Sequence, residues 1–417
     1  MRPLILALLA AVLAGPVRAD PLPGASVDSL LAAARQASPE LRMARLEAEA
    51  AAERVLPAGA LPDPMVRLEL ENITRNGSRS PTLAPGQVGD TQYTLIQPLP
   101  YWGKRDLKRE QAAAEAEAAR GQAGDTWLAL ATRIKLLHAQ RWQTHQALDL
   151  TRQNLDLTAR LARIAQARYA GGLAPQQDAI RAQVERTNLE AELLAMESER
   201  HHQMAYLNTL LARPADAPLA EPTVLRPEPE PARLDPAALA GRLAERNPLL
   251  ATEAALLTAA EKGRDLTYRN RYPDFTVGVS PMQVGSRVDA WNLMLEMNIP
   301  LQQNSRQSQE REAERRVEAA QARREALGHR LVGEVSAALA ELEAARATAT
   351  LTATRLLPQA ELGFKAALAG YETGQVDFAT LLEAQKQIRN ARLALLRAQT
   401  ARQIRLAEIE RLIGEDL

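Results

Sequence analysis

The chain of 417 residues carries 51 basic and 51 acidic side chains and no cysteine. This charge balance lacks the positive excess expected of a nucleic-acid-binding protein. We therefore expect no nucleic-acid partner. The missing cysteines exclude disulfides, thiol chemistry and an acylated N-terminal cysteine, so we also expect no lipid anchor. Only 3% of residues are aromatic, while small and charged helix formers abound, which predicts a mainly helical chain.

The first residues are typical of a secretory signal peptide. Arg2 precedes an apolar run at 4–13, and Val17-Arg18-Ala19 has the small residues of a cleavage site. We therefore assign 1–19 to a signal peptide. The run is too short to span a bilayer as a helix, and no later segment offers the roughly 20 apolar residues that this requires. We expect any membrane insertion to use β-strands.

Two similar units make up the rest of the chain. A shift of 202 residues places Gly172 on Gly374, and a shift of 209 places Pro39 on Pro248. Internal symmetry of this kind indicates a duplication. The predicted boundaries are a first repeat at 20–212, a proline-rich equatorial connector at 213–236 and a second repeat at 237–417.

Each repeat is predicted to contain a helix, two strands and a helical hairpin. In the first repeat, a helix from Val27 to Leu56 is followed by Val66, Leu68 and Leu70, which alternate with charged residues in the two-residue period of a strand. A turn is expected at Pro281 to Asp289 in the second repeat. The four strands are expected at about 64–73, 91–99, 273–281 and 290–301.

Long helical tracts follow each pair of strands. Leu381, Ile388 and Leu395 recur every seven residues, which is coiled-coil spacing. The helical hairpins are expected at about 104–212 and 305–414. The tract after the first strand pair would reach about 100 Å at 1.5 Å per residue. Prolines in the connector disfavour helix there.

Four strands are too few to close a barrel, since single-chain barrels begin at about eight strands and open edges are not tolerated in lipid. We therefore expect several copies of the chain to pool their strands. Half of the aromatic residues fall in or beside the strands, as interfacial girdles do. These residues are Tyr93, Tyr101, Trp102, Tyr268, Tyr272, Phe275 and Trp291.

Several motifs recur in a fixed order. They are Gln97-Pro98-Leu99-Pro100 with Gly103-Lys104-Arg105, Ile299-Pro300-Leu301 with Arg306, Leu357-Pro358-Gln359-Ala360-Glu361, and Tyr371-Glu372-Thr373-Gly374 with Leu381-Leu382-Glu383-Ala384-Gln385. In their order and duplication they resemble the TolC-like outer membrane efflux family, or outer membrane factors, across essentially the whole mature chain. Leu61-Pro62-Asp63-Pro64 before the first strand resembles the heavy-metal efflux branch, although Trp102 stands where proline is usual.

The resemblance implies a mainly α fold with a β-barrel membrane part: a homotrimer with a twelve-stranded barrel on a long periplasmic helical tunnel. It implies a passive exit duct of a tripartite system, located in the outer membrane of a Gram-negative bacterium and extending into the periplasm. The implied partners are a periplasmic adaptor protein, an inner-membrane transporter of the RND type and outer-membrane lipid. Heavy-metal cations are the expected cargo, and multidrug or type I secretion export is the alternative.

The hairpin turns are the candidate functional residues. The resemblance places them at the periplasmic end of the tunnel, where the pore narrows and the adaptor docks. The candidate docking residues are Gly171, Gly172, Leu173, Tyr371, Gly374 and Val376. Asp178 and Glu383 occupy positions where relatives carry constriction carboxylates, while Thr380 replaces an acidic residue there and Val376 an arginine.

The remaining candidates favour structural interpretations. His201 and His202 point about 100° apart on a helix and have no further ligand at metal spacing, so we expect no metal site. Gly103-Lys104 lacks the glycine-rich loop of a phosphate site and predicts a turn from strand to helix. No catalytic constellation is present, and we expect neither an enzyme nor a cofactor. The alternative of another class is a soluble periplasmic coiled-coil scaffold.

Overall fold

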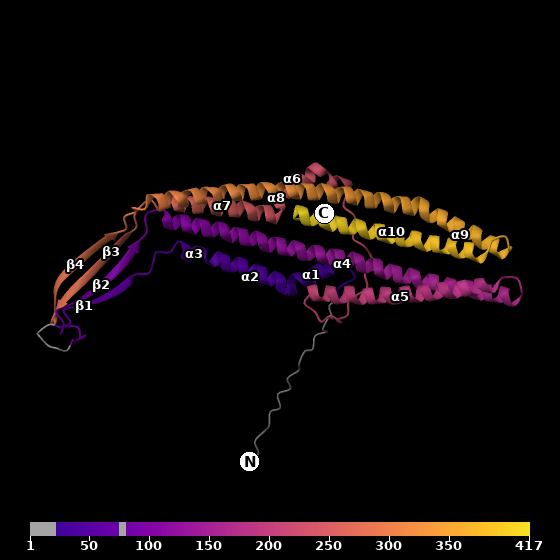
Figure 1. Cartoon of the computed structure of the whole chain (residues 1–417), viewed down its shortest axis with the longest axis horizontal. Coiled ribbons are helices and arrows are strands. Elements are labelled where there is room, and N and C mark those ends of the chain that lie inside the picture. The colour runs from indigo at the N-terminus through magenta and orange to yellow at the C-terminus, as the bar shows by residue number, and fades with distance from the viewer. Residues whose placement is uncertain (1–21, 75–80) are drawn as a thin grey trace, which may run out of the picture. The chain divides into compact units, whose positions relative to one another are not determined.

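The computed structural model describes residues 22–74 and 81–417, so the predicted signal peptide lies outside the described residues. The chain is mainly helical and contains one antiparallel sheet of four strands (Figure 1). Helices precede each pair of strands, and long helices follow each pair. Within the described residues, no helix combines the length and the apolarity needed to cross a membrane.

The helices that precede the strands are interrupted by a proline in each half, at Pro39 and at Pro248. They are α1 (Val27–Ala37), α2 (Pro39–Glu53) and α3 (Val55–Ala58) in the first half, and α6 (Pro236–Arg246) and α7 (Pro248–Arg269) in the second. The expected continuous helix from Val27 to Leu56 is therefore wrong. Proline has no N–H and keeps the residue before it out of the helical conformation. Ser38 and Asn247 occupy these positions and cap the helices that follow, each accepting backbone N–H groups.

The sheet joins strands from both halves of the sequence. Its strands are β1 (Met65–Glu71), β2 (Asp90–Leu99), β3 (Phe275–Val284) and β4 (Arg287–Met297). They are antiparallel in the order β1-β2-β3-β4, so β2 of the first half pairs with β3 of the second. Among the described residues, no strand pairs with the outer side of β1 or of β4. Both edges of the sheet are therefore open.

The turn between β3 and β4 is shorter than expected. The predicted turn at Pro281 to Asp289 is wrong, because β3 continues through Pro281, which pairs with Trp291. The chain instead reverses at Gly285, whose φ of +62° favours glycine. Proline cannot donate to the ladder, and the pairing of β2 with β3 is interrupted beside Pro281, with a register shift following at Met282.

The long helices form two hairpins. They are α4 (Lys104–Ala170) and α5 (Gln176–Leu210), and then α8 (Gln303–Leu351), α9 (Leu357–Glu372) and α10 (Phe378–Ile413). A π-helical segment, Thr352–Leu356, connects α8 to α9 just before Pro358. Proline removes one hydrogen bond of the regular ladder, and a π segment accommodates such an interruption without ending the helix.

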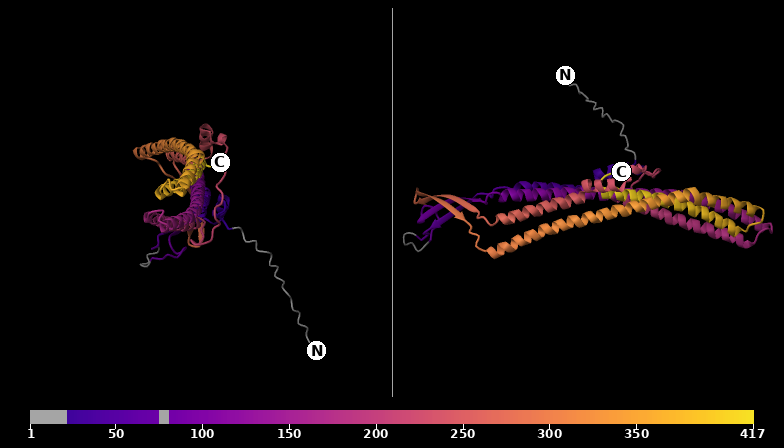
Figure 2. Two further views of the ribbon diagram at one scale, coloured as in Figure 1. Left: turned by 90° about the vertical axis from the view of Figure 1, so that its right-hand side faces the viewer. Right: turned by 90° about the horizontal axis from the view of Figure 1, so that it is seen from above.

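The contacts divide the chain into two compact units. Unit 1 contains the described residues up to Ala37 together with Leu137–Arg226 and Ala360–Leu396, and it includes both hairpin turns. Unit 2 contains Ser38–Leu136, Pro227–Gln359 and Arg397–Leu417, and it includes the sheet. In unit 2, α7 and α8 lie side by side (Figure 2).

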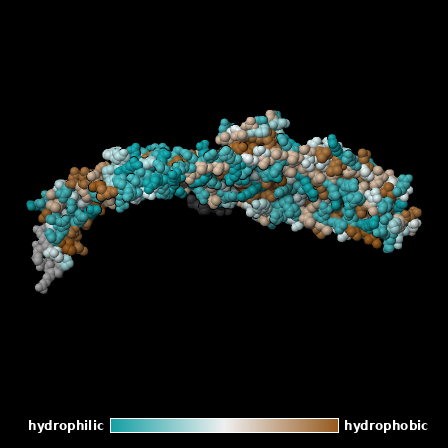
Figure 3. Space-filling model, turned by 45° about the horizontal axis from the view of Figure 1, so that its top comes forward, coloured by the Kyte–Doolittle hydropathy of each residue, from teal (hydrophilic) through white to brown (hydrophobic). Residues whose placement is uncertain are grey.

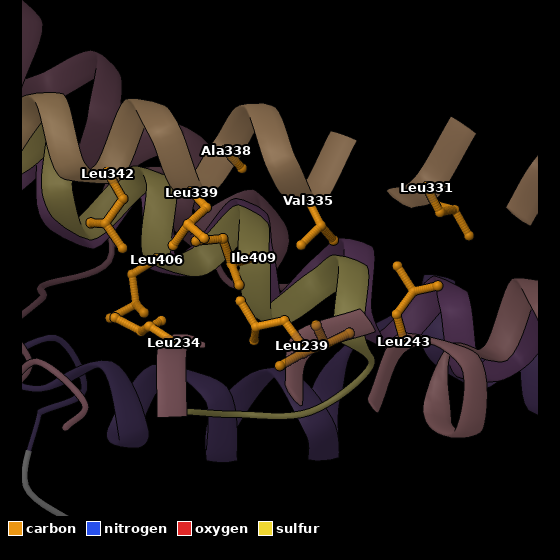
Figure 4. Close-up of a cluster of buried hydrophobic side chains, with 11 residues drawn as sticks. Leu234, Leu239, Leu243, Leu331, Val335, Ala338, Leu339, Leu342, Leu406 and Ile409 are labelled. Carbon is orange, nitrogen blue, oxygen red and sulfur yellow. The ribbon is translucent and has the colours of Figure 1, made fainter. Parts of the chain in front are cut away.

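Each unit has its own apolar core. In unit 2, α6, α8 and α10 contribute Leu239, Leu342 and Ile409, all 0% exposed, and the 3-10 helix η2 (Pro231–Leu234) contributes Leu234 (Figure 4). In unit 1, α4, α5, α9 and α10 bury Ala165, Phe378 and Leu381 beside the hairpin turns. Small and branched side chains at helical spacing produce this close packing of long helices.

Unit 2 also buries an ion pair. The Lys135 ammonium lies 2.8 Å from the Glu410 carboxylate, and their side chains are 5% and 2% exposed. The mostly exposed Asp416 carboxylate also contacts Lys135. A buried pair of this kind contributes little net stability, but removing one partner leaves an uncompensated charge.

Unit 1 buries a histidine beside the N-terminal helix. His138 is 2% exposed and hydrogen-bonds to the backbone of Ala25. Burial, reinforced by the positive charges of Arg141 and Arg226, lowers the pKa of His138 to about 4, although the Ala25 contact and Asp28 oppose this. The imidazole is therefore neutral at neutral pH.

Candidate functional site

The two faces of the sheet differ in chemistry. The register places Val66, Leu68, Tyr93, Leu95, Phe275, Val277, Val279, Trp291, Leu293, Leu295 and Met297 on one face. This apolar face is open to the surroundings, with Val66 and Leu293 both 76% exposed (Figure 3). The opposite face carries the polar residues Arg67, Glu69, Gln92, Ser280, Asn292 and Glu296, together with Met65, Ile96, Met282 and Met294. A continuous exposed apolar surface marks contact with a membrane or another protein.

The end of the sheet next to α4 is built from aromatic and charged groups. Tyr101 and Tyr272 stack with ring centroids 4.5 Å apart. The buried Lys104 donates to the Asp274 carboxylate at 2.8 Å, and the same carboxylate accepts the Tyr101 N–H at 2.7 Å. Gly103, with φ of +82°, turns the chain from β2 into α4. The predicted strand-to-helix turn at Gly103-Lys104 is confirmed.

Both hairpin turns depend on a glycine in the left-handed region. Gly172 has φ of +73° and Gly374 has φ of +78°. The turns close with matching hydrogen bonds, from Leu173 N–H to the Arg168 carbonyl at 2.8 Å and from Gln375 N–H to the Gly370 carbonyl at 2.8 Å. A helix that ends in this way satisfies carbonyls that its last turn leaves free.

Arg168 links the two turns in unit 1. Its guanidinium donates to the Tyr371 carbonyl at 2.5 Å and lies 4.7 Å from the centre of the Tyr371 ring. Tyr371 in turn packs edge-on against the fully buried Phe378 at 5.5 Å. A cation over an aromatic ring is favourable, more so when it is partly removed from water. Arg168 was not among the predicted site residues, because nothing local to that residue indicates its partner about 200 positions away.

Two carboxylates lie beside these turns. Asp178 is 7% exposed, and burial raises its pKa, as does the charge of Asp377, while Arg181 and Arg168 act in the opposite direction. Asp377 instead accepts hydrogen bonds from the Thr380 hydroxyl and backbone N–H, which lower its pKa and cap α10. The acid at 178 is therefore part of the packed turn region.

A second ionic cluster joins α5 to α10. The Glu185 carboxylate, 7% exposed, lies 2.9 Å from Lys386, and Arg389 lies 3.0 Å from Glu192. These ion pairs were not predicted from the sequence. Their signal was the seven-residue spacing of Glu185 and Glu192, which places both on one face of a helix. The pairs add charge complementarity to the apolar packing of the two helices.

The predicted docking residues are not equally accessible. Gly171, Gly172 and Gly374 are exposed, and the Leu173 side chain is 72% exposed. Tyr371 is only 4% exposed. Val376 is half-buried, close to Gly370. Of the two predicted constriction residues, Glu383 is exposed and Asp178 is buried.

The two adjacent histidines are exposed on α5. The His201 ring nitrogen Nδ1 lies 2.8 Å from the Glu197 carbonyl, one helical turn earlier. Within residues 22–74 and 81–417, no three histidine or acidic side chains are grouped so that they could hold a metal ion.

Comparison with known proteins gives a family match in both halves. The family model described as "Outer membrane efflux protein" matches residues 30–213 and 239–415. Among curated proteins, the cobalt-zinc-cadmium resistance protein CzcC of Cupriavidus metallidurans is 25% identical over 386 residues, covering 89% of this chain and 85% of the relative.

Solved structures share the fold. The outer membrane protein VceC of Vibrio cholerae has a TM-score of 0.79 at 20% identity and covers 94% of this chain and 96% of its own. CusC, whose structures describe transmembrane channel formation, has a TM-score of 0.81 at 18% identity and covers 93% and 92%. The open-state outer membrane channel MtrE of Neisseria gonorrhoeae has a TM-score of 0.77 at 17% identity and covers 94% and 89%.

Proposed function

Because the chain belongs to the outer membrane efflux protein family, we propose that it is the outer-membrane exit duct of a tripartite efflux system. Members of the family are passive channels rather than enzymes. One observation carries the proposal: the four-stranded sheet has open edges at β1 and β4 and a continuous exposed apolar face. Hydrocarbon tolerates the apolar face but not the open edges.

Three copies of the chain would satisfy these edges. If β4 of one copy pairs with β1 of the next, twelve strands close a barrel, with the apolar face toward lipid and the polar face toward the lumen. Arg67, Glu69 and Glu296 would then line a water-filled passage. The long helical hairpins would continue this passage into the periplasm as a tunnel.

The absence of native cysteine makes this arrangement directly testable. Leu68→Cys on β1 and Leu293→Cys on β4 place one thiol near each edge, on the same face. Treatment of outer membranes with a short bis-maleimide should give a ladder that ends at three chains. Each single substitution alone should give no ladder. The proposal would be refuted by a doubly substituted protein that stays monomeric or that is recovered from the soluble periplasm.

The hairpin turns are the proposed periplasmic entrance. Exposed Leu173 and the exposed glycines of both turns form the proposed adaptor-docking surface, and the buried Tyr371 supports it through Arg168. Glu383 is the exposed candidate for a constriction carboxylate, whereas Asp178 would act from within the packed turn region. A cysteine at 173 should crosslink to the periplasmic adaptor, and a cysteine at the exposed position 323 on α8 serves as the comparison.

We propose transition-metal cations as the cargo, supported by the similarity to a cobalt-zinc-cadmium resistance protein. Deletion of the chromosomal copy should lower tolerance to cobalt, zinc and cadmium salts more than tolerance to lipophilic drugs, and plasmid expression should restore it. Loss of drug tolerance alone would favour a multidrug channel. Loss of a secreted protein alone would favour type I secretion.

A further inference from the structure

At the end of the sheet next to α4, unit 2 contains a groove that the proposed channel function does not use. It measures about 470 Å³, within the range of roughly 300–1,000 Å³ typical of small-molecule sites. Its lining residues are Leu61, Leu99, Trp102, Arg105, Phe275 and Leu295, with neighbouring backbone and side-chain atoms. The apolar members from β2, β3 and β4 belong to the apolar face of the sheet.

An indole and a guanidinium lie at the mouth of the groove. The Trp102 side chain is 75% exposed, and its ring lies 6.0 Å from that of Phe275. Tryptophan with one apolar side and one polar N–H is favoured where hydrocarbon meets water. Arg105 donates its Nε–H to the Gly59 carbonyl at 2.9 Å, which holds the side chain in place.

Arg105 and Lys108, the positive charges beside the groove, form no direct ion pair among the described residues of unit 2, although the charge of Lys108 acts on the Asp274 carboxylate. Asp106, the carboxylate that also lines the groove, pairs with Arg109 at 3.2 Å. Among the described residues, no carboxylate lies within 4 Å of Arg105 or of the exposed Lys108. The fork of Arg105 matches a phosphate group, and Lys108 adds a second positive charge one helical turn along α4.

We propose that this groove binds an anionic phospholipid of the inner leaflet of the outer membrane, such as phosphatidylglycerol. One acyl chain lies against Leu99, Phe275 and Leu295, and the phosphate lies at Arg105 and Lys108. This inference rests on the proposed membrane channel. A neighbouring copy of the chain would pair through backbone groups at the outer edges of β1 and β4, whereas most strand residues of the groove, Leu99, Phe275 and Val277, lie on the inner strands β2 and β3.

The charge pattern also selects the headgroup. Phosphatidylethanolamine presents an ammonium group together with its phosphate, and two unpaired cations repel that ammonium. Phosphatidylglycerol carries the same phosphate with a neutral glycerol group. The phosphate contacts are therefore common to both lipids, and the preference comes from repulsion of the ammonium, for which about tenfold corresponds to 1.4 kcal/mol. We therefore expect the intact protein to retain phosphatidylglycerol over phosphatidylethanolamine by about this factor.

Native mass spectrometry of the assembled protein in detergent, with equal amounts of the two lipids, tests the site. Arg105→Gln with Lys108→Gln should abolish the preference. Arg323→Gln with Arg324→Gln removes the same charge from an exposed part of α8 and should leave the preference intact. An assembled Arg105→Gln/Lys108→Gln variant that keeps the preference, or an equal loss in the α8 control, overturns the phospholipid site while leaving the channel proposal standing.

A second measurement needs no charge variant. Trp127→Phe, Trp142→Phe and Trp291→Phe leave Trp102 as the single tryptophan. In nanodiscs that contain a small fraction of brominated phosphatidylglycerol, Trp102 fluorescence should be quenched about tenfold more effectively than by the same fraction of brominated phosphatidylethanolamine. Equal quenching by the two lipids overturns the proposal. Failure of the protein to assemble in a membrane would instead refute the proposed function.

Discussion

Gly374→Val should loosen the second hairpin turn without disturbing the rest of the protein. At φ of +78° a β-branched residue is strained by about 1 to 3 kcal/mol. The nearest atom to an added Cβ is the Arg168 guanidinium at 3.9 Å, so the cost is torsional rather than steric. Strain of this size raises the population of the open turn about 5- to 150-fold, since 1.4 kcal/mol corresponds to a factor of ten.

Hydrogen exchange measured by mass spectrometry reads this opening directly. Amides at 370–378 should exchange faster by that factor in Gly374→Val, while amides in β2 and β3 should not change. Gly363→Val is the matched control, because Gly363 lies within α9, has an ordinary helical φ and has nothing within 4 Å of an added Cβ. Ala366→Val tests an exposed position on the same helix.

Adaptor crosslinking and export should show the same difference between Gly374→Val and the two α9 controls. Gly374→Val should assemble normally, yet crosslink poorly to the adaptor and fail to restore metal tolerance, because a small docking surface depends on a few well-placed residues. Both α9 controls should export normally. If Gly374→Val exchanges, crosslinks and exports like Gly363→Val, the reasoning about the turn is wrong.

Three further predictions concern buried charge and the exposed histidines. Lys135→Met should lower the free energy of unfolding by roughly 3 to 5 kcal/mol, because it removes the lysine charge that balances the buried Glu410 carboxylate. Circular dichroism should show this as a lower thermal midpoint. The pKa of His138 is lowered to about 4, so the unfolded chain binds a proton that the folded chain refuses between about pH 6.5 and 4. The contribution of the neutral imidazole to the free energy of unfolding is therefore fully present above this pH window, and it falls by about 3 kcal/mol as the pH drops through the window. Hydrogen exchange in α1 should become faster over the same range. His201→Ala with His202→Ala should leave metal tolerance unchanged.

Each of these has a direct check. Adding Glu410→Leu to Lys135→Met should recover most of the lost stability, and no recovery would contradict the buried-charge explanation. His138→Gln should flatten the acid dependence of α1 exchange. Retention of the full pH dependence in that variant would assign it to another group. Loss of metal tolerance on removing both histidines would show that they contact the cargo.

The strands and their faces were predictable because a two-residue period is a local property of the sequence. The alternation of Val66 and Leu68 with charged residues is enough to identify the apolar face of β1. The extent of β3 was not predictable in this way, because Pro281 is usually a sign of a turn. Its position in a strand depends on a register shift at Met282, which only the paired strands define.

The hairpin turns were also only partly predictable from the sequence. Glycine spacing located Gly172 and Gly374, and the structure gives both the positive φ that only a turn requires. The burial of Tyr371 and Asp178 was not predictable, because each lies near residues of the other hairpin: Arg168 contacts Tyr371, and the charge of Asp377 acts on Asp178. Side chains buried between helices far apart in sequence leave no local pattern.

In the proposed trimer, the open edges of the sheet also determine how quickly each chain must find its partner copies. An unpaired strand edge templates pairing with any other extended chain, and this one is joined to an exposed apolar face. Productive closure and misassembly therefore compete from the same starting species, and both accelerate as chains accumulate. Slow synthesis favours the closed barrel only if each chain enters the membrane before its open strand edge pairs with another chain that is still outside the membrane. In the proposed trimer, the expression level therefore influences how much of the protein assembles correctly.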